Sequence, residues 1–341
     1  MFETNGTLLT VRDLVKHFEI RKGLMGKVRG YVRAVDGVSF DIAPGETLGL
    51  AGESGCGKTT TGRLILRLLD ATSGFVSFRG SPNLLQLSQS EMRSFRKEMQ
   101  IIFQDPYSSL NPRLTVGSTL AEPLKIFGLV KGRDARRGRC IELLEAVGLD
   151  EEHLSRYPHE FSGGQRQRIG VARALSVEPS LIIADEPVSA LDLSIQGQII
   201  NLLIDLKRRL GLSYLIIAHD LSVIRHISDR VAIMYLGRIV ELAAKDDLYN
   251  RPLHPYTRAL LAAVPVPDPS RRQPKQLLEG DVPSPVNPPP GCHFHPRCAR
   301  RFDPCDRIDP PLVDLGGHKV ACHLYPEGSQ PNAECGVRNV E

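Results

Sequence analysis

The sequence predicts an α/β fold built on a parallel β-sheet. Three short apolar runs, at residues 46–51, 181–184 and 214–218, are continuous rather than alternating, which is typical of parallel strands buried on both faces. Between these runs, the stretches after Lys58 and around residues 141–147 repeat apolar side chains at helical spacing. Strands that alternate with helices in this way form a sheet covered by helices.

The remaining elements are predicted from local patterns. Residues 8–42 are rich in Val and Phe and carry turn signals, which indicates a small antiparallel β layer. After Lys58, an apolar helical face is expected to include Leu64, Ile65, Leu68 and Leu69. A further helical run is expected from Arg166 to Leu175.

Composition divides the chain near residue 250. Residues 251–341 hold 17 of the 25 prolines, so this part can form few long helices or central strands. We therefore expect one domain over residues 1–250 and a separate C-terminal region over 251–341.

The formal net charge of +4 gives no sign of the clustered cations that bind nucleic acid. Neither a secretory signal nor an apolar run of roughly 18 to 20 residues is found, so a cytoplasmic location is expected.

A phosphate-binding loop is predicted between the first parallel strand and the helix after it. Its glycines allow the backbone to curl, so that successive N–H groups and the helix N-terminus converge on phosphate oxygens. Lys58 would reach the β- and γ-phosphates, and the Thr59 hydroxyl would bind Mg²⁺. The residues predicted to contact nucleotide in this loop are Gly52, Ser54, Gly55, Cys56, Gly57, Lys58, Thr59 and Thr60.

Two acids end the apolar run at 181–184. Asp185 fits the role of a second Mg²⁺ ligand, and Glu186 fits that of the base or polarising group for the attacking water. An acid pair at a strand end is weak evidence alone, because such acids are often merely solvated. The phosphate loop upstream strengthens the prediction.

A second glycine-rich helix start follows Phe161. The sequence Ser162-Gly163-Gly164-Gln165 again offers free backbone N–H groups to an anion. One phosphate chain needs only one cradle, so two such helix starts suggest that two molecules share nucleotides between them.

With these motifs in order, the chain resembles the ATP-binding subunits of ABC transporters, whose signature sequence completes the site of a partner subunit. The resemblance implies a RecA-like P-loop core with an antiparallel β subdomain, an inserted helical subdomain at about 106–175, and a Pro- and Cys-rich C-terminal extension. It further implies that Gln104 contacts Mg²⁺ and water, that Asp192 lies in the loop crossing the dimer, that His219 holds the γ-phosphate and that Phe18 stacks on adenine. Phe161 replaces the usual Leu at a packing position.

The resemblance extends to the oligopeptide and dipeptide importer branch over essentially the whole chain. Supporting stretches include residues 104–112, 189–196 and His254-Pro-Tyr-Thr257. It implies ATP hydrolysis that powers peptide uptake, with the same machinery importing nickel or another small solute as an alternative. The implied partners are a second ATP-binding subunit, either identical or a sister chain, two transmembrane permeases and, indirectly, an extracytoplasmic solute-binding protein, with no nucleic acid. The location implied is the cytoplasmic face of the inner membrane.

A DNA-maintenance ATPase could share the nucleotide motifs. Here, however, only about 60 residues separate Gln104 from Gln165, which is too few for the long coiled coils of that class.

Four of the seven cysteines, Cys292, Cys298, Cys305 and Cys322, crowd into the C-terminal region. In a reducing compartment, such crowding favours a metal over disulfides. Their intervals of five, six and sixteen residues contain no Cys-x-x-Cys pair of the zinc-ribbon kind. Four thiolates suit zinc or an iron–sulfur cluster. The resemblance implies a [4Fe–4S] cluster, while Zn²⁺ and unligated thiols or a disulfide stay open.

Overall fold

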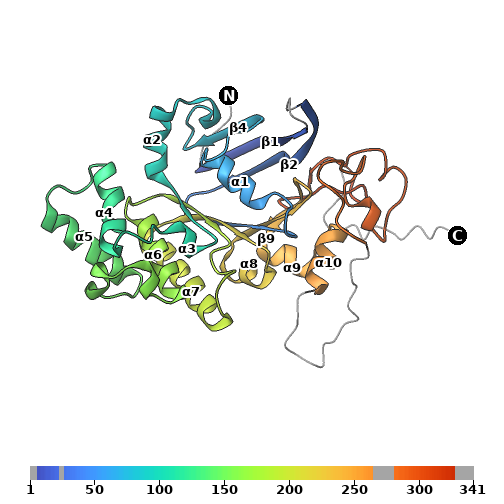
Figure 1. The fold of residues 1–341 in the computed structure, drawn as a ribbon. Helices are drawn as coiled ribbons and strands as arrows, with labels where there is room; N and C mark the ends of the chain where they lie inside the picture. The colour runs from blue at the N-terminus through green and yellow to red at the C-terminus, as the bar shows by residue number, and fades with distance from the viewer. Residues whose placement is uncertain (1–5, 23–26, 264–279, 327–341) are drawn as a thin grey trace, which may run out of the picture. The chain divides into compact units, whose positions relative to one another are not determined.

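The computed structural model describes residues 6–22, 27–263 and 280–326. These residues form two compact units, each made of several chain segments, and Figure 1 traces their elements in chain order. The described residues of the first unit fall within Met1–Thr10, Asp41–Thr47 and Ser77–Ala218, and those of the second fall within Val11–Phe40, Leu48–Val76 and His219–Glu341. Along the described stretches, none of the helices combines the length and apolarity that crossing a bilayer requires.

The first unit contains parallel strands and most of the helices. Its elements are β5 (Met99–Ile102), β6 (Leu181–Asp185), β7 (Ser213–Ala218), α2 (Gln89–Glu98), α3 (Pro106–Ser109), α4 (Val116–Ile126), α5 (Arg133–Ala146), α6 (Gly163–Leu175) and α7 (Leu193–Leu210). Strand β6 pairs in parallel with β5 and with β7, so that Ile183 lies opposite Ile101 and Leu215. Every residue of β6 and β7 is buried, which explains why both strands read as unbroken apolar runs. The predicted parallel sheet is confirmed here.

The second unit holds a three-stranded sheet, a further set of strands and the C-terminal region. Its elements are β1 (Leu9–Lys22), β2 (Lys27–Ile42), β3 (Thr47–Ala51), β4 (Ser73–Phe78), β8 (Arg230–Tyr235), β9 (Arg238–Ala244), β10 (Val313–Asp314), β11 (Lys319–Val320), α1 (Lys58–Ile65), α8 (Leu221–Ile227), α9 (Lys245–Asn250) and α10 (Pro255–Ala263). Strands β2, β1 and β4 form the small sheet in that order, where the sequence predicted a β layer. Strand β3 pairs in parallel with β8, which pairs antiparallel with β9.

Helix α1 is shorter than its apolar pattern predicted. It ends at Ile65, and Arg67 takes a left-handed backbone conformation with φ 52°. The chain then leaves the helix, so Leu68 is exposed instead of extending the buried face. A left-handed residue cannot continue a right-handed helix, and apolar spacing alone does not reveal it.

The proline-rich C-terminal region contains only α10, one 3₁₀ turn (His295–Arg297) and the two-residue strands β10 and β11 among its described residues. Strand β11 pairs antiparallel with β9, placing Val320 opposite Glu241. Leu315, Val320 and Tyr325 form a small apolar core of their own. Segments 264–279 and 327–341 of this predicted region lie outside the described residues.

Candidate nucleotide-binding site

The predicted phosphate loop connects β3 to α1, as its motif requires. Gly52, Gly55 and Gly57 have φ values of 151°, 80° and 107°, which side-chain-bearing residues rarely adopt. A Cβ on Gly52 would lie 2.2 Å from the Met234 carbonyl oxygen, and one on Gly57 would lie 2.0 Å from that of Ala34. The loop therefore needs glycine both for its curvature and for its close packing.

Lys58, at the first position of α1, is buried and turns back over the loop. Its Nζ donates to the carbonyl oxygen of Gly52 at 2.7 Å and to that of Glu53 at 3.0 Å. The ammonium group is thus held against the loop by two backbone acceptors. Thr59 and Thr60 follow in the first turn of α1, where the backbone N–H groups of a helix have no intrahelical partners.

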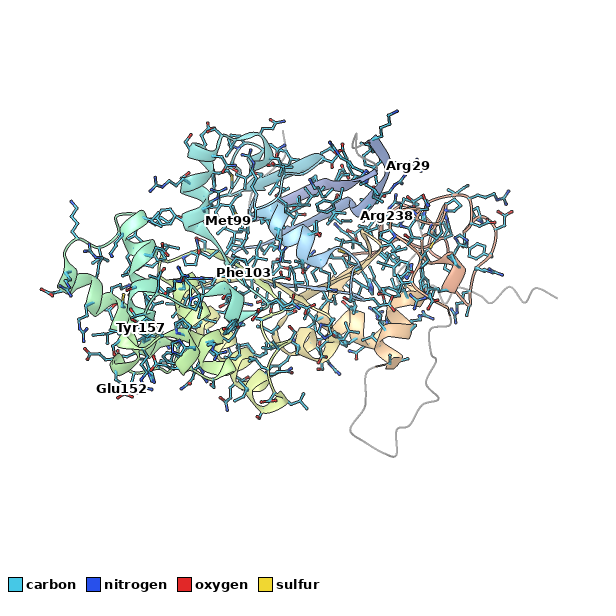
Figure 2. All side chains as sticks on the ribbon, viewed as in Figure 1. Arg29, Met99, Phe103, Glu152, Tyr157 and Arg238 are labelled. Atoms are coloured by element: carbon cyan, nitrogen blue, oxygen red, sulfur yellow. The ribbon has the colours of Figure 1, made fainter. Side chains whose placement is uncertain are left out.

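In the first unit, the structure brings two predicted catalytic residues together. Asp185 is the buried last residue of β6, and Glu186 follows it directly. The Nε2 of Gln104 donates to Oε2 of Glu186 at 2.7 Å (82 residues apart in sequence). Phe103, labelled in Figure 2, precedes Gln104 and lies under the guanidinium group of Arg173 at 5.8 Å.

Glu186 has an unusual backbone for a non-glycine residue, with φ 48°. Its N–H donates to the carbonyl oxygen of Ile217 at 2.8 Å, which anchors this conformation to the neighbouring strand. Such a conformation costs about 1–3 kcal/mol and concentrates at functional sites. The geometry aims the carboxylate at Gln104 at the expense of local strain.

The signature residues cap α6. Ser162 Oγ accepts from the Gln165 N–H at 3.3 Å, and the Gln165 side chain accepts from the Ser162 N–H at 3.0 Å. Ser162 and Gly163 are exposed, whereas Gly164 is buried with no room for a Cβ, which would lie 2.6 Å from Ile195. Phe161 is buried beside His153, in agreement with its predicted packing role. The result is an exposed N-terminus on a 13-residue helix.

The other predicted residues are divided between the units. Asp192, at the N-terminus of α7, is in the first unit with Gln104 and the signature. Phe18, the phosphate loop and His219 are in the second unit. His219 is exposed.

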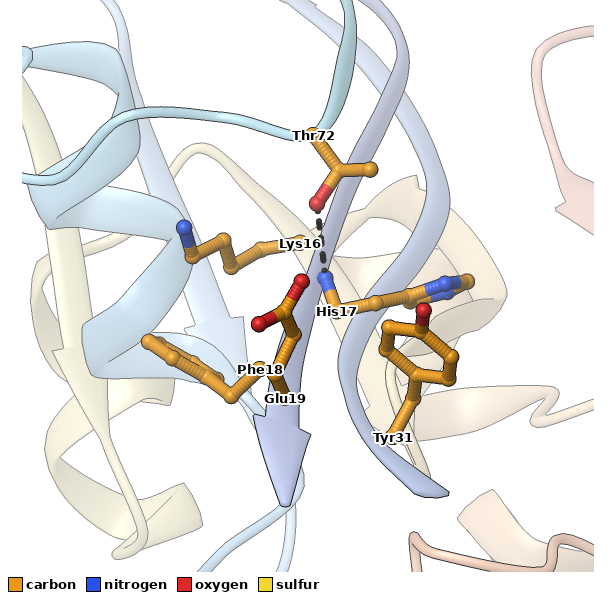
Figure 3. Close-up of a pocket in the computed structure, with 6 residues that line it drawn as sticks. All are labelled: Lys16, His17, Phe18, Glu19, Tyr31 and Thr72. Atoms are coloured by element: carbon orange, nitrogen blue, oxygen red, sulfur yellow. Dashed lines mark hydrogen bonds between the residues drawn. The ribbon is translucent and has the colours of Figure 1, made fainter. Parts of the chain in front are cut away.

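Phe18 lines a surface cavity of about 640 Å³ formed by β1, β2 and Thr72 (Figure 3). In Figure 3, Lys16 and Phe18 extend to one side of β1, and His17 extends to the other, beside Tyr31. The His17 N–H donates to Thr72 Oγ1 at 3.0 Å. Lys16 Nζ lies 5.0 Å from the centre of the Phe18 ring. On this side of β1, Phe18 therefore offers an aromatic face and Lys16 offers a cation.

A buried carboxylate, Glu241 of β9, anchors the C-terminal region. Its Oε1 accepts from the Leu253 N–H and lies 2.7 Å from Nε2 of His318, and its Oε2 accepts from the His254 N–H at 2.9 Å. His254 Nδ1 in turn accepts from the Tyr256 N–H at 3.0 Å. Burial lowers the pKa of His254 to about 4, so this ring is neutral near pH 7. The His254-Pro-Tyr-Thr motif is therefore a turn held on β9.

Replacing Glu241 with Ala is expected to destabilise the protein by about 3–5 kcal/mol, because three partners, two of them buried, lose their acceptor. Glu241→Gln keeps one carbonyl oxygen and is expected to cost less. Urea unfolding would measure both losses. As a control, Glu142→Ala removes an exposed acid that pairs with Arg139, and it is expected to change stability by no more than about 1 kcal/mol. Equal stability for the Glu241 and Glu142 variants would contradict this role.

The four C-terminal cysteines line one small cavity of about 10 Å³. Burial raises the pKa of Cys292 to about 11 and that of Cys322 to about 12, so both are neutral thiols near pH 7. All cysteines within the described residues are free, so the disulfide alternative is not supported for them. The same residues contain no group of three or more His, Cys, Asp or Glu side chains placed to hold a metal ion.

The predicted iron–sulfur or zinc ligand set at Cys292, Cys298, Cys305 and Cys322 is therefore not supported by this geometry. The four cysteines line one cavity, but the described residues hold no group of side chains placed to bind a metal ion. Crowding in sequence predicted proximity correctly but could not give the distances between sulfur atoms.

Comparison with known proteins gives the class to which this fold and loop belong. The family described as "ABC transporter" matches residues 35–189, and the "Oligopeptide/dipeptide transporter, C-terminal region" matches residues 240–305. A "Probable peptide ABC transporter ATP-binding protein y4tS" of Sinorhizobium fredii is 54% identical over 93% of this chain and 90% of its own. The "Dipeptide transport ATP-binding protein DppF" of Escherichia coli is 49% identical over 95% of this chain and 96% of its own.

A solved structure supports the same family assignment. The dimeric, post-hydrolysis ATP-binding cassette MJ0796 bound to ADP and phosphate superimposes with a TM-score of 0.62, at 28% identity, over 70% of this chain and 99% of that one. The chain belongs to the ATP-binding subunits of ABC transporters. Within that family, it carries the oligopeptide/dipeptide type of C-terminal region.

Proposed function

We propose that this chain is the ATP-hydrolysing subunit that powers the uptake of di- or oligopeptides through a membrane ABC importer. The observation that carries the proposal is the presence, in one chain, of the phosphate loop at residues 52–59 and the oligopeptide/dipeptide C-terminal region at 240–305. As part of this proposal, residues 1–250 form the ABC ATPase domain, with a helical subdomain at about 106–175, and residues 251–341 form the C-terminal region.

The function is tested by reconstituting the chain with its permeases and solute-binding protein in vesicles. Peptide-loaded binding protein is expected to stimulate ATP hydrolysis and to drive peptide accumulation. If only a nickel-loaded binding protein stimulated ATP hydrolysis, the cargo would be a small solute and not a peptide. Stimulation by DNA, without an effect of the membrane partners, would overturn the transporter proposal.

Within the chain, the proposed roles follow the geometry of each unit. Lys58 and the amides of the phosphate loop hold the β- and γ-phosphates, and Phe18 stacks on the adenine. Glu186 receives the proton of the attacking water, and its hydrogen bond from Gln104 fixes the direction of its carboxylate. His219 binds the γ-phosphate.

The hydroxyl of Thr59, the amide oxygen of Gln104 and the carboxylate of Asp185 are the proposed Mg²⁺ ligands. Oxygen donors of these kinds are those that Mg²⁺ prefers, so the residues present fit this ion. When bound, Mg²⁺ would neutralise charge that develops on the phosphate oxygens.

A second subunit is proposed to complete each nucleotide site through Ser162, Gly163, Gly164 and Gln165, together with Asp192. The exposed N-terminus of α6 supports this role, because its backbone N–H groups and helix dipole favour an anion. ATP binds the closed pair better than the open pair if it forms part of the interface, which is the condition for a ligand to drive closure. The partner is either an identical chain or a sister subunit, and light scattering with ATP would distinguish them.

The other proposed partners are two transmembrane permeases and, through them, an extracytoplasmic solute-binding protein. The proposed location is peripheral, on the cytoplasmic face of the inner membrane. We place the permease contact around residues 107–120, where Tyr107 is 60% exposed beneath the guanidinium group of Arg166. An exposed aromatic side chain of this kind is typical of contact surfaces.

For the four-cysteine cavity, we propose metal binding, with a [4Fe–4S] cluster as the leading candidate and Zn²⁺ as the alternative. The support is the convergence of all four sulfur-bearing residues on one cavity, and binding requires the thiols to ionise and rearrange. Iron, sulfide and zinc analysis of anaerobically purified protein tests it, with Cys140→Ser as a control outside the cavity. Protein free of all three elements would contradict this proposal.

The Phe18→Ala variant is expected to bind ATP about tenfold more weakly, because base stacking on an aromatic side chain contributes about 1–3 kcal/mol. Affinity for inorganic triphosphate is expected to stay unchanged, since the triphosphate carries no base. Calorimetric titration of both ligands would measure this difference. The exposed aromatic Tyr157, labelled in Figure 2, supplies the control variant Tyr157→Ala. An equal loss for both ligands would contradict a base-stacking role.

A further inference from the structure

The second residue of the phosphate loop, Glu53, forms a bidentate ion pair with Arg297 of the C-terminal region. Arg297 Nη1 lies 2.8 Å from Oε2 of Glu53, and Nη2 lies 3.2 Å from Oε1. The Arg297 side chain is 6% exposed and that of Glu53 is 25% exposed. Two parallel hydrogen bonds between these groups give orientation as well as charge pairing.

The backbone of Glu53 is fixed by two further groups. Its N–H donates to the hydroxyl of Tyr256 at 3.0 Å, and its carbonyl oxygen accepts from Lys58 Nζ at 3.0 Å. The residue that pairs with Arg297 through its side chain therefore also holds the ammonium group proposed to bind phosphate. A shift of Glu53 would move an acceptor of Lys58.

Arg297 is itself held in position by aromatic packing. Its guanidinium carbon lies 6.0 Å from the centre of the Tyr235 ring. Phe294, three residues earlier, packs against Tyr235 and Tyr256 with ring centres 5.4 Å and 5.3 Å apart. The hydrogen bonds to Glu53 are the main reason why the pKa of Arg297 is raised, so the guanidinium keeps its charge.

The charge of Glu53 makes this ion pair relevant to nucleotide binding. A carboxylate in a loop that receives a polyphosphate opposes binding unless it is neutralised, since like charges in a partly buried site repel strongly. An unpaired Glu53 would also compete with phosphate for Lys58. Arg297 satisfies both oxygens of the carboxylate and keeps it directed toward the C-terminal region.

We propose that Arg297 is a positioning residue for ATP binding, which neutralises and holds Glu53 so that the C-terminal region sets the affinity of the phosphate loop. The proposal rests on the nucleotide site described under the proposed function. Arg297 lies between Cys292 and Cys298, so a rearrangement at the four-cysteine cavity would reach the loop through this ion pair.

The test compares full-length variants by calorimetric titration with ATP and by steady-state hydrolysis. Arg297→Gln is expected to bind ATP at least tenfold more weakly, while its rate at saturating ATP stays within about twofold of the unaltered protein. Arg297→Lys, which restores a charge without the bidentate geometry, is expected to recover part of the affinity. The double variant Glu53→Gln/Arg297→Gln is expected to bind more tightly than Arg297→Gln, because the unpaired acid is gone.

A matched control is Arg307→Gln, since Arg307 belongs to the same region and its exposed side chain pairs with Asp303. This control is expected to bind ATP as the unaltered protein does. Unchanged affinity in Arg297→Gln, or no gain in the double variant, would overturn this inference alone. Failure of the unaltered protein to bind ATP would overturn the proposed function as well. If Arg297→Gln does not fold, Arg297→Lys decides: it is expected to bind ATP more weakly than the unaltered protein, because it lacks the bidentate geometry, and unchanged affinity would overturn the inference.

Discussion

The Glu186→Gln variant is expected to bind ATP with nearly unchanged affinity and to hydrolyse it about 100- to 10,000-fold more slowly, the usual contribution of general-base catalysis. Glutamine keeps the size of the side chain but cannot accept the proton of water. Under the proposed mechanism, in which hydrolysis reopens the pair, closed dimers are therefore expected to accumulate with ATP and to persist. Phosphate release and size-exclusion chromatography with light scattering would measure both effects.

The control for this variant is Glu152→Gln. Glu152 is an exposed acid of the first unit, 2.9 Å from Arg156, and is labelled in Figure 2. Its variant is expected to hydrolyse ATP at the normal rate. A Glu186→Gln protein that also retained normal turnover would show that another group accepts the proton.

The Lys58→Ala variant is expected to lose at least 100-fold in ATP affinity, equivalent to about 2.7 kcal/mol. Hydrogen bonds from a charged donor to phosphate are among the strongest in proteins, and Lys58 is buried where solvent screens such bonds poorly. Alanine also leaves the carbonyl groups of Gly52 and Glu53 without their ammonium donor. Calorimetric titration with ATP would measure the loss.

The exposed Lys131 provides the control variant Lys131→Ala, which removes the same charge from a loop before α5. Its ATP affinity is expected to be unchanged. Similar weakening in both variants would mean that overall charge, and not a direct contact, accounts for the effect.

The parts of the fold that were predictable from sequence depend on local physics. Strands β3, β6 and β7 are buried along their lengths, so their residues had to form continuous apolar runs. The phosphate loop was predictable because its backbone takes positive φ values that glycine adopts readily. The end of α1 was not, because the left-handed Arg67 leaves no mark in the apolar periodicity.

The parts of the site that were missed depend on contacts between distant residues. Glu53 and Arg297 are separated by 244 positions, and Glu53 and Tyr256 by 203, so no spacing rule relates them. The His254–Thr257 motif was visible as a mark of the family, but its hydrogen bond to the phosphate loop was not. The four cysteines illustrate the opposite case, because proximity in sequence overstated how well their thiols are arranged for a metal.

The carboxylate of Glu241 has a consequence for shortened forms of the protein. A chain cut after α9 would keep every nucleotide motif between Phe18 and His219, yet it would leave an acid in the interior without the amide and imidazole groups that solvate it. The unpaired buried carboxylate would destabilise β9 and also β8, which pairs antiparallel with it. Trimming the chain to its nucleotide motifs is therefore a poor route to a crystallisable fragment of this subunit, and expression designs should retain the chain at least through His318.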